Sequence, residues 1–317
     1  MKFVYKKIWN ELLRRFPAIA EEEVALPEDA SLTAHSRAME PVLRLVLRLR
    51  GYLSPILLQG EPGSGKEFWA RTIHRLSPRA DGPFVVVDLE TIPARFIDTF
   101  LFGPASEKRL LVGKGEAGKV ALAEGGTLYL HAVEMLPPES QEKLVRLLRR
   151  RFPAPGNNGN GNGSNGEKRH RQPARPLVRV LAGTAGNLED FVQRGLFRRD
   201  LFYRLSVFPV QLPPLRSRAE DIPALAEYFL RRYGRILGKK AHRIHPDSFA
   251  WMMHYFWPGN LDELREFILL NLHFAPANDE VIQLRLLPDI LRRTAATGQD
   301  EAVQHSNAQI NRRRNIV

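Results

Sequence analysis

The stretch SPILLQGEPGSGKE, residues 54–67, decides the expected fold, because an apolar run leads directly into a glycine-rich loop. Residues 54–60 predict a short buried strand, and a helical pattern follows from Lys66 to Leu76. The spacing G-x-x-x-x-G-K between a strand and a helix is typical of a loop whose backbone N–H groups bind a triphosphate while the lysine reaches its β and γ phosphates. A glycine-rich turn without a ligand is the alternative. The predicted nucleotide-binding residues are Gly60, Glu61, Pro62, Gly63, Ser64, Gly65, Lys66 and Glu67.

Length and composition bound the class of protein. The 317 residues suffice for an α/β domain and a smaller one, and a hydrophobic content of 44% is ordinary for a folded chain. The absence of cysteine excludes disulfides, thiolate metal ligands and cysteine nucleophiles. Since no apolar run is long enough for a membrane span and no signal peptide is recognisable, we expect a cytoplasmic protein. The net charge of +12 invites a nucleic-acid partner, but the scattered arginines favour a solvated basic surface.

Apolar segments separated by helical patterns predict a parallel sheet that is covered on both faces. After the first strand, the expected strands are 83–89, 127–130, 177–184 and 206–212. The Gly- and Asn-rich segment 155–173 is expected to be a disordered surface insertion in the same domain, because it has too little apolar surface to bury. From residue 213 onward the pattern is helical, with helices expected at 219–237, 246–255, 260–273 and 284–294.

These patterns predict four regions along the chain. An amphipathic helix from Phe3 to Phe16 is expected either to pack against its own domain or a partner, which is the favoured interpretation, or to lie on a membrane surface. A second helix is expected over residues 37–50. The predicted domains are an N-terminal helical segment 1–30, an α/β nucleotide-binding domain 31–215, a small all-α domain 216–295 and a polar tail 296–317.

Several motifs occur in one order along residues 30–295. They are LTAHSRAM (32–39), GEPGSGKE (60–67), FLFG (100–103), ALAEGGTLYL (121–130), GLFRRDLFYRLSVFPVQLPPLRSR (195–218), EDIPAL (220–225) and YFWPGNLDEL (255–264). Together they resemble the central AAA+ domain of bacterial enhancer-binding proteins, the ATP-driven activators of sigma-54 RNA polymerase. The resemblance implies a phosphate-loop AAA+ fold with a parallel sheet of about five strands flanked by helices, and a small all-α lid. It also implies a hexameric ring, ATP between subunits, and a GAFTGA loop that contacts the sigma factor.

The sequence departs from this family where ATP is hydrolysed. The family ends the strand at residues 127–130 with Asp-Glu, and here His131 and Ala132 follow. The family's sensor strand ends in Ala-Thr-Asn, and here Ala185 takes the place of the asparagine. Its lid arginine is replaced by Asp262, with Arg265 one turn further on. The GAFTGA sequence is absent, its place taken by PASEKRLLVGKGEAGKV, and neither a receiver domain nor a DNA-binding helix-turn-helix is recognisable. Glu67, after the loop lysine, follows the family's habit.

These replacements predict a loss of hydrolysis. Phosphate-loop NTPases hold magnesium with a loop hydroxyl and a strand aspartate, but here Glu67 and His131 occupy those positions, so Mg²⁺ binding should be poor and no metal ligand is assigned. Losing the carboxylate that activates water lowers the rate by on the order of 10² to 10⁴. No catalytic residue is therefore assigned. Asp88, at the end of the neighbouring strand, is a candidate substitute, although a strand-end carboxylate is more often a cap, and His131 is a weaker candidate base.

Two arginines remain where the family places its arginine fingers, the residues that reach the ATP of the next subunit. Arg198 and Arg204 match these positions by resemblance, and the alternative is that they belong to an ordinary basic surface. The favoured hypothesis is an ATP-binding, hydrolysis-deficient protein that modulates a ring of its own copies or of AAA+ homologues, with sigma-54 polymerase as a further candidate partner. The alternatives are an active ATPase with substitute residues and an interaction scaffold that binds no nucleotide.

Overall fold

The computed structural model describes residues 36–103, 118–149 and 178–284. The predicted helix 3–16, the insertion 155–173, the tail 296–317 and nearly all of the expected helix 284–294 lie outside these ranges. Contacts divide the chain between Pro214 and Leu215 into two compact units. The predicted outer limits of the domains stay predictions.

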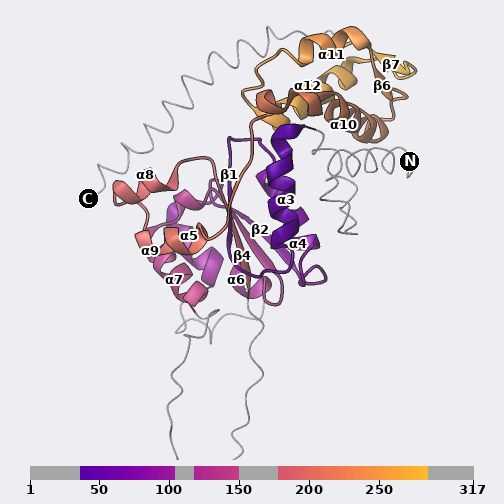
Figure 1. Ribbon diagram of the computed structural model, residues 1–317. Helices are drawn as coiled ribbons and strands as arrows, with labels where there is room; N and C mark the ends of the chain where they lie inside the picture. The colour runs from indigo at the N-terminus through magenta and orange to yellow at the C-terminus, as the bar shows by residue number, and fades with distance from the viewer. Residues whose placement is uncertain (1–35, 104–117, 150–177, 285–317) are drawn as a thin grey trace, which may run out of the picture. The chain divides into compact units, whose positions relative to one another are not determined.

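The first unit is built on a parallel sheet, whose strands β1, β2 and β4 are labelled in Figure 1. The sheet has five strands in the order β2-β3-β4-β1-β5. Its strands are β1 (Ile56–Gln59), β2 (Phe84–Asp88), β3 (Thr127–His131), β4 (Arg179–Thr184) and β5 (Pro209–Gln211). All five occur where the apolar runs predicted them. The predicted fold class, an α/β domain with a five-stranded parallel sheet and a separate helical unit, is confirmed.

Helices cover both faces of this sheet, as Figure 1 shows. Residue Leu57 packs into one core, while its neighbours Ile56 and Leu58 pack into the other, so both faces of β1 are apolar. One core is shared with η2 (Arg37–Met39), α3 (Glu40–Leu49) and α4 (Lys66–Arg75). The other core is shared mainly with α5 (Ala94–Phe102), α6 (Lys119–Leu122), η4 (Val133–Met135), α7 (Pro138–Arg149), α8 (Leu188–Gln193) and α9 (Arg199–Leu205).

Because all five strands are parallel, their carboxyl ends meet at one edge of the sheet. Gln59 pairs with Thr184, and Asp88 pairs with His131, so the last residues of neighbouring strands lie side by side. The Gly60 N–H continues the β1–β4 ladder by donating to the Thr184 carbonyl at 3.2 Å. The phosphate loop after β1 and the substituted ends of β3 and β4 therefore share this carboxyl edge.

The second unit is helical, as predicted, with one small addition. Its elements are η5 (Leu215–Asp221), α10 (Ile222–Ile236), β6 (Arg243–Ile244), α11 (Pro246–Met252), α12 (Asn260–Phe274) and β7 (Val281–Ile282). The parallel β6–β7 ladder was not predicted, because two residues are too few to show an alternating pattern. Its core includes Trp257, which is fully buried and donates its indole N–H to the Met252 carbonyl at 2.8 Å.

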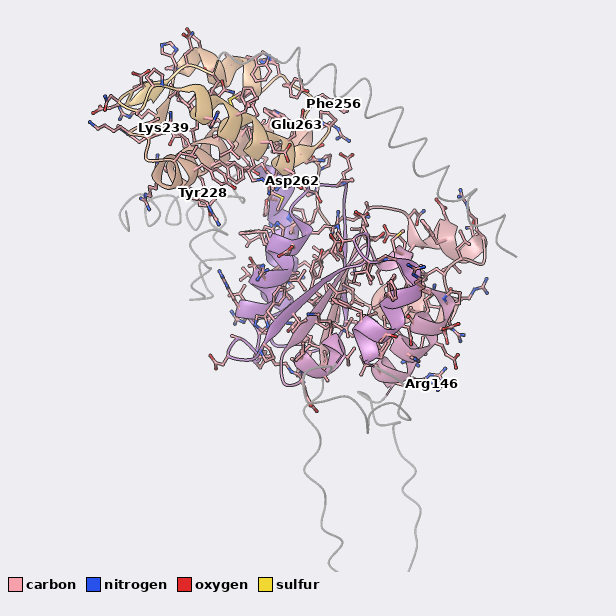
Figure 2. The ribbon with its side chains drawn as sticks, turned by 180° about the vertical axis from the view of Figure 1, so that it is seen from behind. Arg146, Tyr228, Lys239, Phe256, Asp262 and Glu263 are labelled. Carbon is pink, nitrogen blue, oxygen red and sulfur yellow. The ribbon has the colours of Figure 1, made fainter. Side chains whose placement is uncertain are left out.

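The WPGN turn before α12 is a specific structure. Trp257 and Asn260 have φ values of 50° and 54°, a left-handed conformation that costs residues with a Cβ about 1–2 kcal/mol. The buried Asn260 side chain accepts a hydrogen bond from the Leu215 N–H at 2.7 Å. The turn thereby fixes the start of this unit against the start of α12, where Figure 2 labels Asp262 and Glu263.

Candidate functional site

The phosphate loop owes its shape to glycine. Gly63 and Gly65 have φ values of 69° and 95°, which glycine adopts without the penalty that a Cβ brings. A Cβ on Gly60 would lie 2.8 Å from the Ser64 hydroxyl oxygen and 3.0 Å from the Leu212 carbonyl oxygen. Three of the predicted positions therefore require glycine for geometric reasons. The chain between β1 and α4 is a loop, as the sequence predicted, and nucleotide binding by its residues stays a prediction.

Lys66, the first residue of α4, lies against this loop. Its side chain is buried, with 4% of the residue exposed, and Nζ donates to the carbonyl oxygens of Gly60 at 2.8 Å and Glu61 at 2.9 Å. A buried ammonium next to the N-terminus of a ten-residue helix concentrates positive charge at one point. Pro62 has no N–H, and the N–H groups of Gly60 and Ser64 donate to the carbonyls of Thr184 and Glu61. The other backbone N–H groups of the loop and this ammonium are the groups that would hold the phosphates of a nucleotide.

Glu67 stands where a magnesium-binding hydroxyl is common, but its carboxylate is engaged along its own helix. Oε1 lies 2.6 Å from Arg71 Nη2, and both side chains are 48% exposed. The Arg71 guanidinium carbon lies 4.9 Å from the centre of the Phe84 ring, a cation–π distance. Mg²⁺ prefers oxygen ligands, but Glu67 is paired with Arg71 and residue 131 is an imidazole, so the two usual magnesium positions do not fit this ion.

The end of β3 carries the two replacements that the sequence identified. His131 is half-buried and pairs with Asp88 of β2, and its Nδ1 lies 3.4 Å from the Tyr129 hydroxyl. Ala132 is 2% exposed and has a φ of 53°, so it turns the chain sharply away from the strand. A methyl group cannot accept a proton. Neither residue supplies the carboxylate that would polarise water next to a phosphate.

Tyr129 of β3 lies close to several acidic side chains at the carboxyl edge of the sheet. Its ring fills the space above Gly183 on β4, where a Cβ would lie 2.4 Å from the hydroxyl oxygen. Burial raises the pKa of the Tyr129 hydroxyl, and the negative charges of Glu67, Asp88 and Glu134 raise it further. The hydroxyl therefore stays protonated. Acidic groups lie near this point even though the end of β3 has His131 and Ala132 in place of the family's two acids.

Asp88, the predicted candidate substitute, makes a local hydrogen bond. Its Oδ1 accepts the Glu90 N–H at 3.1 Å, and its backbone carbonyl accepts the Thr91 hydroxyl at 2.9 Å. This is the capping geometry that the alternative interpretation expected of a strand-end carboxylate. A catalytic role for Asp88 stays a prediction.

Glu134 is a site residue that the sequence reasoning missed. It lies on η4, three residues past His131, and its Oε1 accepts the Ala185 N–H at 3.3 Å. Its other oxygen, Oε2, is buried and has no hydrogen-bond partner among the residues that the structure describes. The carboxylate thus bridges the chain segments that follow β3 and β4. The sequence did offer a signal for Glu134, because it is an acid only three residues after a strand end that lacks the family's two acids.

The two finger-like arginines have different surroundings. Arg198 precedes α9 and makes a bidentate pair with Asp200, from Nε at 3.0 Å and Nη2 at 3.1 Å, and this hydrogen bonding holds the pKa of the Asp200 carboxyl below its usual value. Arg204 makes no ion pair within the described ranges, and with Tyr203 and Val207 it lines an open pocket of about 330 Å³. Both side chains are accessible from outside the unit.

A buried glutamine connects the arginine segment to the loop after β3. Gln141 of α7 is 1% exposed, and its Nε2 donates to the carbonyls of Leu136 at 2.8 Å and Leu196 at 3.0 Å. Its Oε1 accepts the Arg198 N–H at 2.8 Å. The backbone at Arg198 is therefore fixed relative to the carboxyl edge of the sheet.

In the helical unit, Asp262 occupies the position where the family has its lid arginine, and its contacts lie within its own helix. Asp262 lies in the first turn of α12, where a negative charge favours the helix dipole, and its Oδ1 lies 3.1 Å from Arg265 Nη1. Arg265 also lies 3.7 Å from the carboxylate of Glu266. The arginine one turn after Asp262 is thus held by acids of its own helix.

Comparisons with known proteins agree with this architecture. The family model described as the sigma-54 interaction domain matches residues 32–211, and that of the AAA+ ATPase lid domain matches residues 216–304. The transcriptional regulator NtrC of Escherichia coli is 40% identical over 229 residues, which cover 72% of this chain and 46% of NtrC. The chain spans about half the length of the curated relatives that it matches.

Two solved structures of NtrX from Brucella abortus are similar to this chain. The complex with ADP has a TM-score of 0.68 and 36% identity, and the match covers 82% of this chain and 55% of NtrX. The complex with ATP has a TM-score of 0.63 and 33% identity, covering 92% of this chain and 63% of NtrX. Among the described helices, none combines the length and the apolar composition that a membrane span requires.

Proposed function

The chain belongs to the sigma-54 interaction domain family of AAA+ proteins, and from this premise we propose that it binds ATP but does not turn it over at a useful rate. The observation that carries the proposal is the contrast at the carboxyl edge of the sheet. The phosphate loop keeps its glycines and its buried Lys66, whereas His131, Ala132 and Ala185 stand where water activation and sensing need an acid or an amide. Binding and hydrolysis depend on different atoms, so one can persist without the other.

ATP is the proposed ligand because the loop geometry fits a triphosphate and because NtrX, a homologue, has been solved with ADP and with ATP. The backbone N–H groups of the loop that are not donated to protein carbonyls, together with the Lys66 ammonium, would hold the phosphates. Magnesium is not proposed as a partner of this site, since Glu67 is paired with Arg71 and His131 replaces the strand aspartate.

The proposed role is that of a modulatory ring subunit in transcription control in the cytoplasm. It would assemble with its own copies or with AAA+ homologues and present Arg198 and Arg204 to the ATP of a neighbour, with sigma-54 RNA polymerase as the candidate target. Support comes from the family membership and from the accessible position of both arginines. Arginines supplied across an interface contribute about 10³ to 10⁵ to the rate in NTPases.

The decisive experiment measures binding and turnover on one sample. We expect calorimetry to show ATP and ADP binding with little dependence on Mg²⁺, and phosphate release no faster than that of Lys66→Ala. Rapid Mg²⁺-dependent phosphate release by the unaltered chain would contradict the proposal. A chain that binds neither nucleotide would instead be the interaction scaffold that the sequence left open.

The ring role is tested by mixing. The chain is added to an active homologue at increasing ratios, and the ATPase rate of the mixture is compared with that obtained with Arg198→Ala or Arg204→Ala. We expect the unaltered chain to change the rate of the homologue and the variants to lose that change. If no mixture differs from the homologue alone, the modulatory role is wrong.

One observation favours a second candidate function, an ATPase that works with substitute residues. Glu134 places a half-buried carboxylate between the ends of β3 and β4, with one oxygen unpartnered among the described residues. If the unaltered chain does hydrolyse ATP, Glu134→Gln should lower the turnover number while leaving the ATP affinity in place. Asp88→Asn tests the other candidate acid in the same assay.

A further inference from the structure

Three potential metal ligands meet at the carboxyl edge of the sheet. Asp88 ends β2, Glu90 follows it by two residues, and His131 ends the neighbouring strand β3. One ligand atom from each of the three residues lies within 4.8 Å of the others. The parallel register, which pairs Asp88 with His131, brings them together from segments more than forty residues apart in sequence.

The separation of these atoms is close to what a metal ion requires. Two ligand atoms that each lie about 2.0–2.2 Å from a tetrahedral ion are roughly 3.3–3.6 Å from each other. The present limit of 4.8 Å is longer than this separation by roughly 1 Å or a little more, so the side chains must move closer to hold an ion. Glu90 is exposed and Asp88 and His131 are half-buried, so Glu90 has the freedom to close and solvent can supply the remaining ligand.

The ligand types select the metal. Two carboxylates and one imidazole suit Zn²⁺, Co²⁺ and similar first-row ions, because imidazole nitrogen is a preferred ligand for these ions. Mg²⁺ instead prefers oxygen ligands in a strict octahedron with several waters. Replacement of the usual strand aspartate by His131 therefore changes the preferred ion and does not simply remove a ligand.

The surroundings favour a cation at this point. Within the described part of the chain, Asp88, Glu90 and His131 take part in no ion pair. The Tyr129 hydroxyl lies 3.4 Å from His131 Nδ1, and the tautomer in which Nδ1 donates to this oxygen leaves the Nε2 lone pair for a metal ion. Besides burial, the carboxylates of Glu67, Asp88 and Glu134 raise the pKa of Tyr129, and Glu67 is itself paired with Arg71.

We propose that Asp88, Glu90 and His131 form a binding site for one divalent transition-metal ion of the Zn²⁺ or Co²⁺ class. The site lies at the same sheet edge as the phosphate loop but uses none of the loop residues. It does not depend on nucleotide binding. The proposal thus goes beyond the proposed ATP-binding function, and either one can fail without the other.

The test is a Co²⁺ titration of the full chain without nucleotide, followed by visible d–d absorption, with Zn²⁺ as the competitor. We expect one Co²⁺ per chain, displaced by Zn²⁺ and not by an excess of Mg²⁺. His131→Ala should weaken Co²⁺ binding by about a hundredfold or more, since even residues that only orient a ligand contribute about 10- to 100-fold to metal affinity. Asp88→Asn and Glu90→Gln, which preserve side-chain shape, should each weaken it as well.

The matched control is His254→Ala, which removes an exposed histidine of the helical unit whose Nδ1 lies 2.7 Å from the Ala250 carbonyl. This variant should bind Co²⁺ like the unaltered chain. The proposal is wrong if the unaltered chain gives no d–d bands, if folded His131→Ala retains its Co²⁺ affinity, or if His254→Ala weakens binding equally. Circular dichroism establishes that each variant is folded, and if His131→Ala is not, the two shape-preserving variants decide.

Discussion

The phosphate loop after β1 and the ends of β3 and β4 lie on one edge of the same sheet, but the loop keeps the glycines and the lysine of its motif, whereas the strand ends are followed by His131, Ala132 and Ala185 in place of the family's residues. In the proposed function the loop would bind phosphate through backbone amide groups and the buried ammonium of Lys66, and its left-handed glycines give the chain the path that this requires. The strand ends work through side chains alone. A site made of backbone amides keeps its binding groups when side chains are replaced. A site made of side chains changes its chemistry when one of them is replaced.

The strand ends have also acquired contacts of their own. Glu134 accepts the Ala185 N–H, and His131 lies beside Asp88 and Tyr129. These contacts stabilise the edge in a form that does not contain the usual acid pair. In the proposed function, the phosphate loop binds the nucleotide while the ends of β3 and β4 no longer support its hydrolysis. Substitutions in each of these two regions test whether binding and hydrolysis are separate.

The largest effect is expected from restoring both acids at the end of β3 with His131→Asp and Ala132→Glu. This double variant would remove the difference between an intact phosphate loop and a strand end without acids. A carboxylate that accepts a proton from water contributes on the order of 10² to 10⁴ to the rate, so phosphate release should rise by up to that factor over the unaltered chain. Steady-state phosphate release with Mg²⁺ measures it. Ala132 already carries a Cβ at a φ of 53°, but it is 2% exposed, so the longer glutamate side chain must find room at a buried position. Circular dichroism therefore has to show that the double variant is folded before its phosphate release is compared.

The control for this experiment adds Lys66→Ala to the restored pair. That triple variant should release phosphate at the background rate, because the phosphates lose their ammonium. If the restored pair alone stays at background while ATP still binds, then the missing sensor amide at Ala185 or the lid is limiting, and the strand-end acids are not the deciding difference.

A second change removes the charged group of the phosphate loop. Lys66→Ala should raise the ATP dissociation constant by about tenfold to a hundredfold, since hydrogen bonds to a charged group contribute about 1.5–3 kcal/mol. Calorimetry or a thermal shift with ATP measures the change. Lys143→Ala is the control, because its ammonium lies 2.6 Å from Asp98 on the surface, away from the loop. Equal losses in both variants would contradict a specific role for Lys66.

A third change tests whether the loop depends on close backbone packing. In Gly60→Ala the new methyl group would lie 3.0 Å from the Leu212 carbonyl oxygen and 2.8 Å from the Ser64 hydroxyl, so the loop must shift. Overpacking of this kind lowers the free energy of unfolding by about 1–3 kcal/mol. Gly51→Ala is the matched control, because a Cβ on Gly51 would meet none of the described atoms within 4 Å. Urea unfolding should separate the two variants clearly.

The parts of the molecule that local patterns encode were predictable from sequence. The five strands are apolar runs between turn residues, and the loop Gly60–Lys66 has a fixed spacing, so both were predicted at their observed positions. The β6–β7 ladder was missed because each strand has two residues. Helical spacing also predicted α12, whose acidic first turn agrees with its dipole.

The contacts across the carboxyl edge could not be predicted in the same way. The grouping of Asp88, Glu90 and His131 depends on the register of two strands that are distant in sequence. The bridge from Glu134 to Ala185 depends on how η4 turns after Ala132. Such contacts follow from three-dimensional packing, and single-sequence patterns specify only the elements that carry them.

The smallest expected effect concerns the scaffold that the two regions share. His74, near the end of α4, is 5% exposed, and its Nδ1 lies 2.9 Å from the hydroxyl of Thr127 at the start of β3. It therefore joins the helix that follows the phosphate loop to the strand that ends in His131. Burial lowers the pKa of His74 below its ordinary 6.5, and the positive charges of Arg179, Arg75 and Arg71 lower it further, against one backbone hydrogen bond that raises it.

Because the folded state disfavours the imidazolium, the unfolded chain binds more protons than the folded chain below pH 6.5. The stability that neutral His74 provides is complete above that pH and is lost as the pH falls toward the lowered folded-state pKa, at up to about 1.4 kcal/mol per pH unit. Urea unfolding at a series of pH values from about 7.5 to about 5 measures this slope. His74→Gln should reduce the slope, and the exposed control His254→Gln should not. Equal slopes in all three proteins would show that this helix–strand contact does not control how the loop and the strand ends are held together.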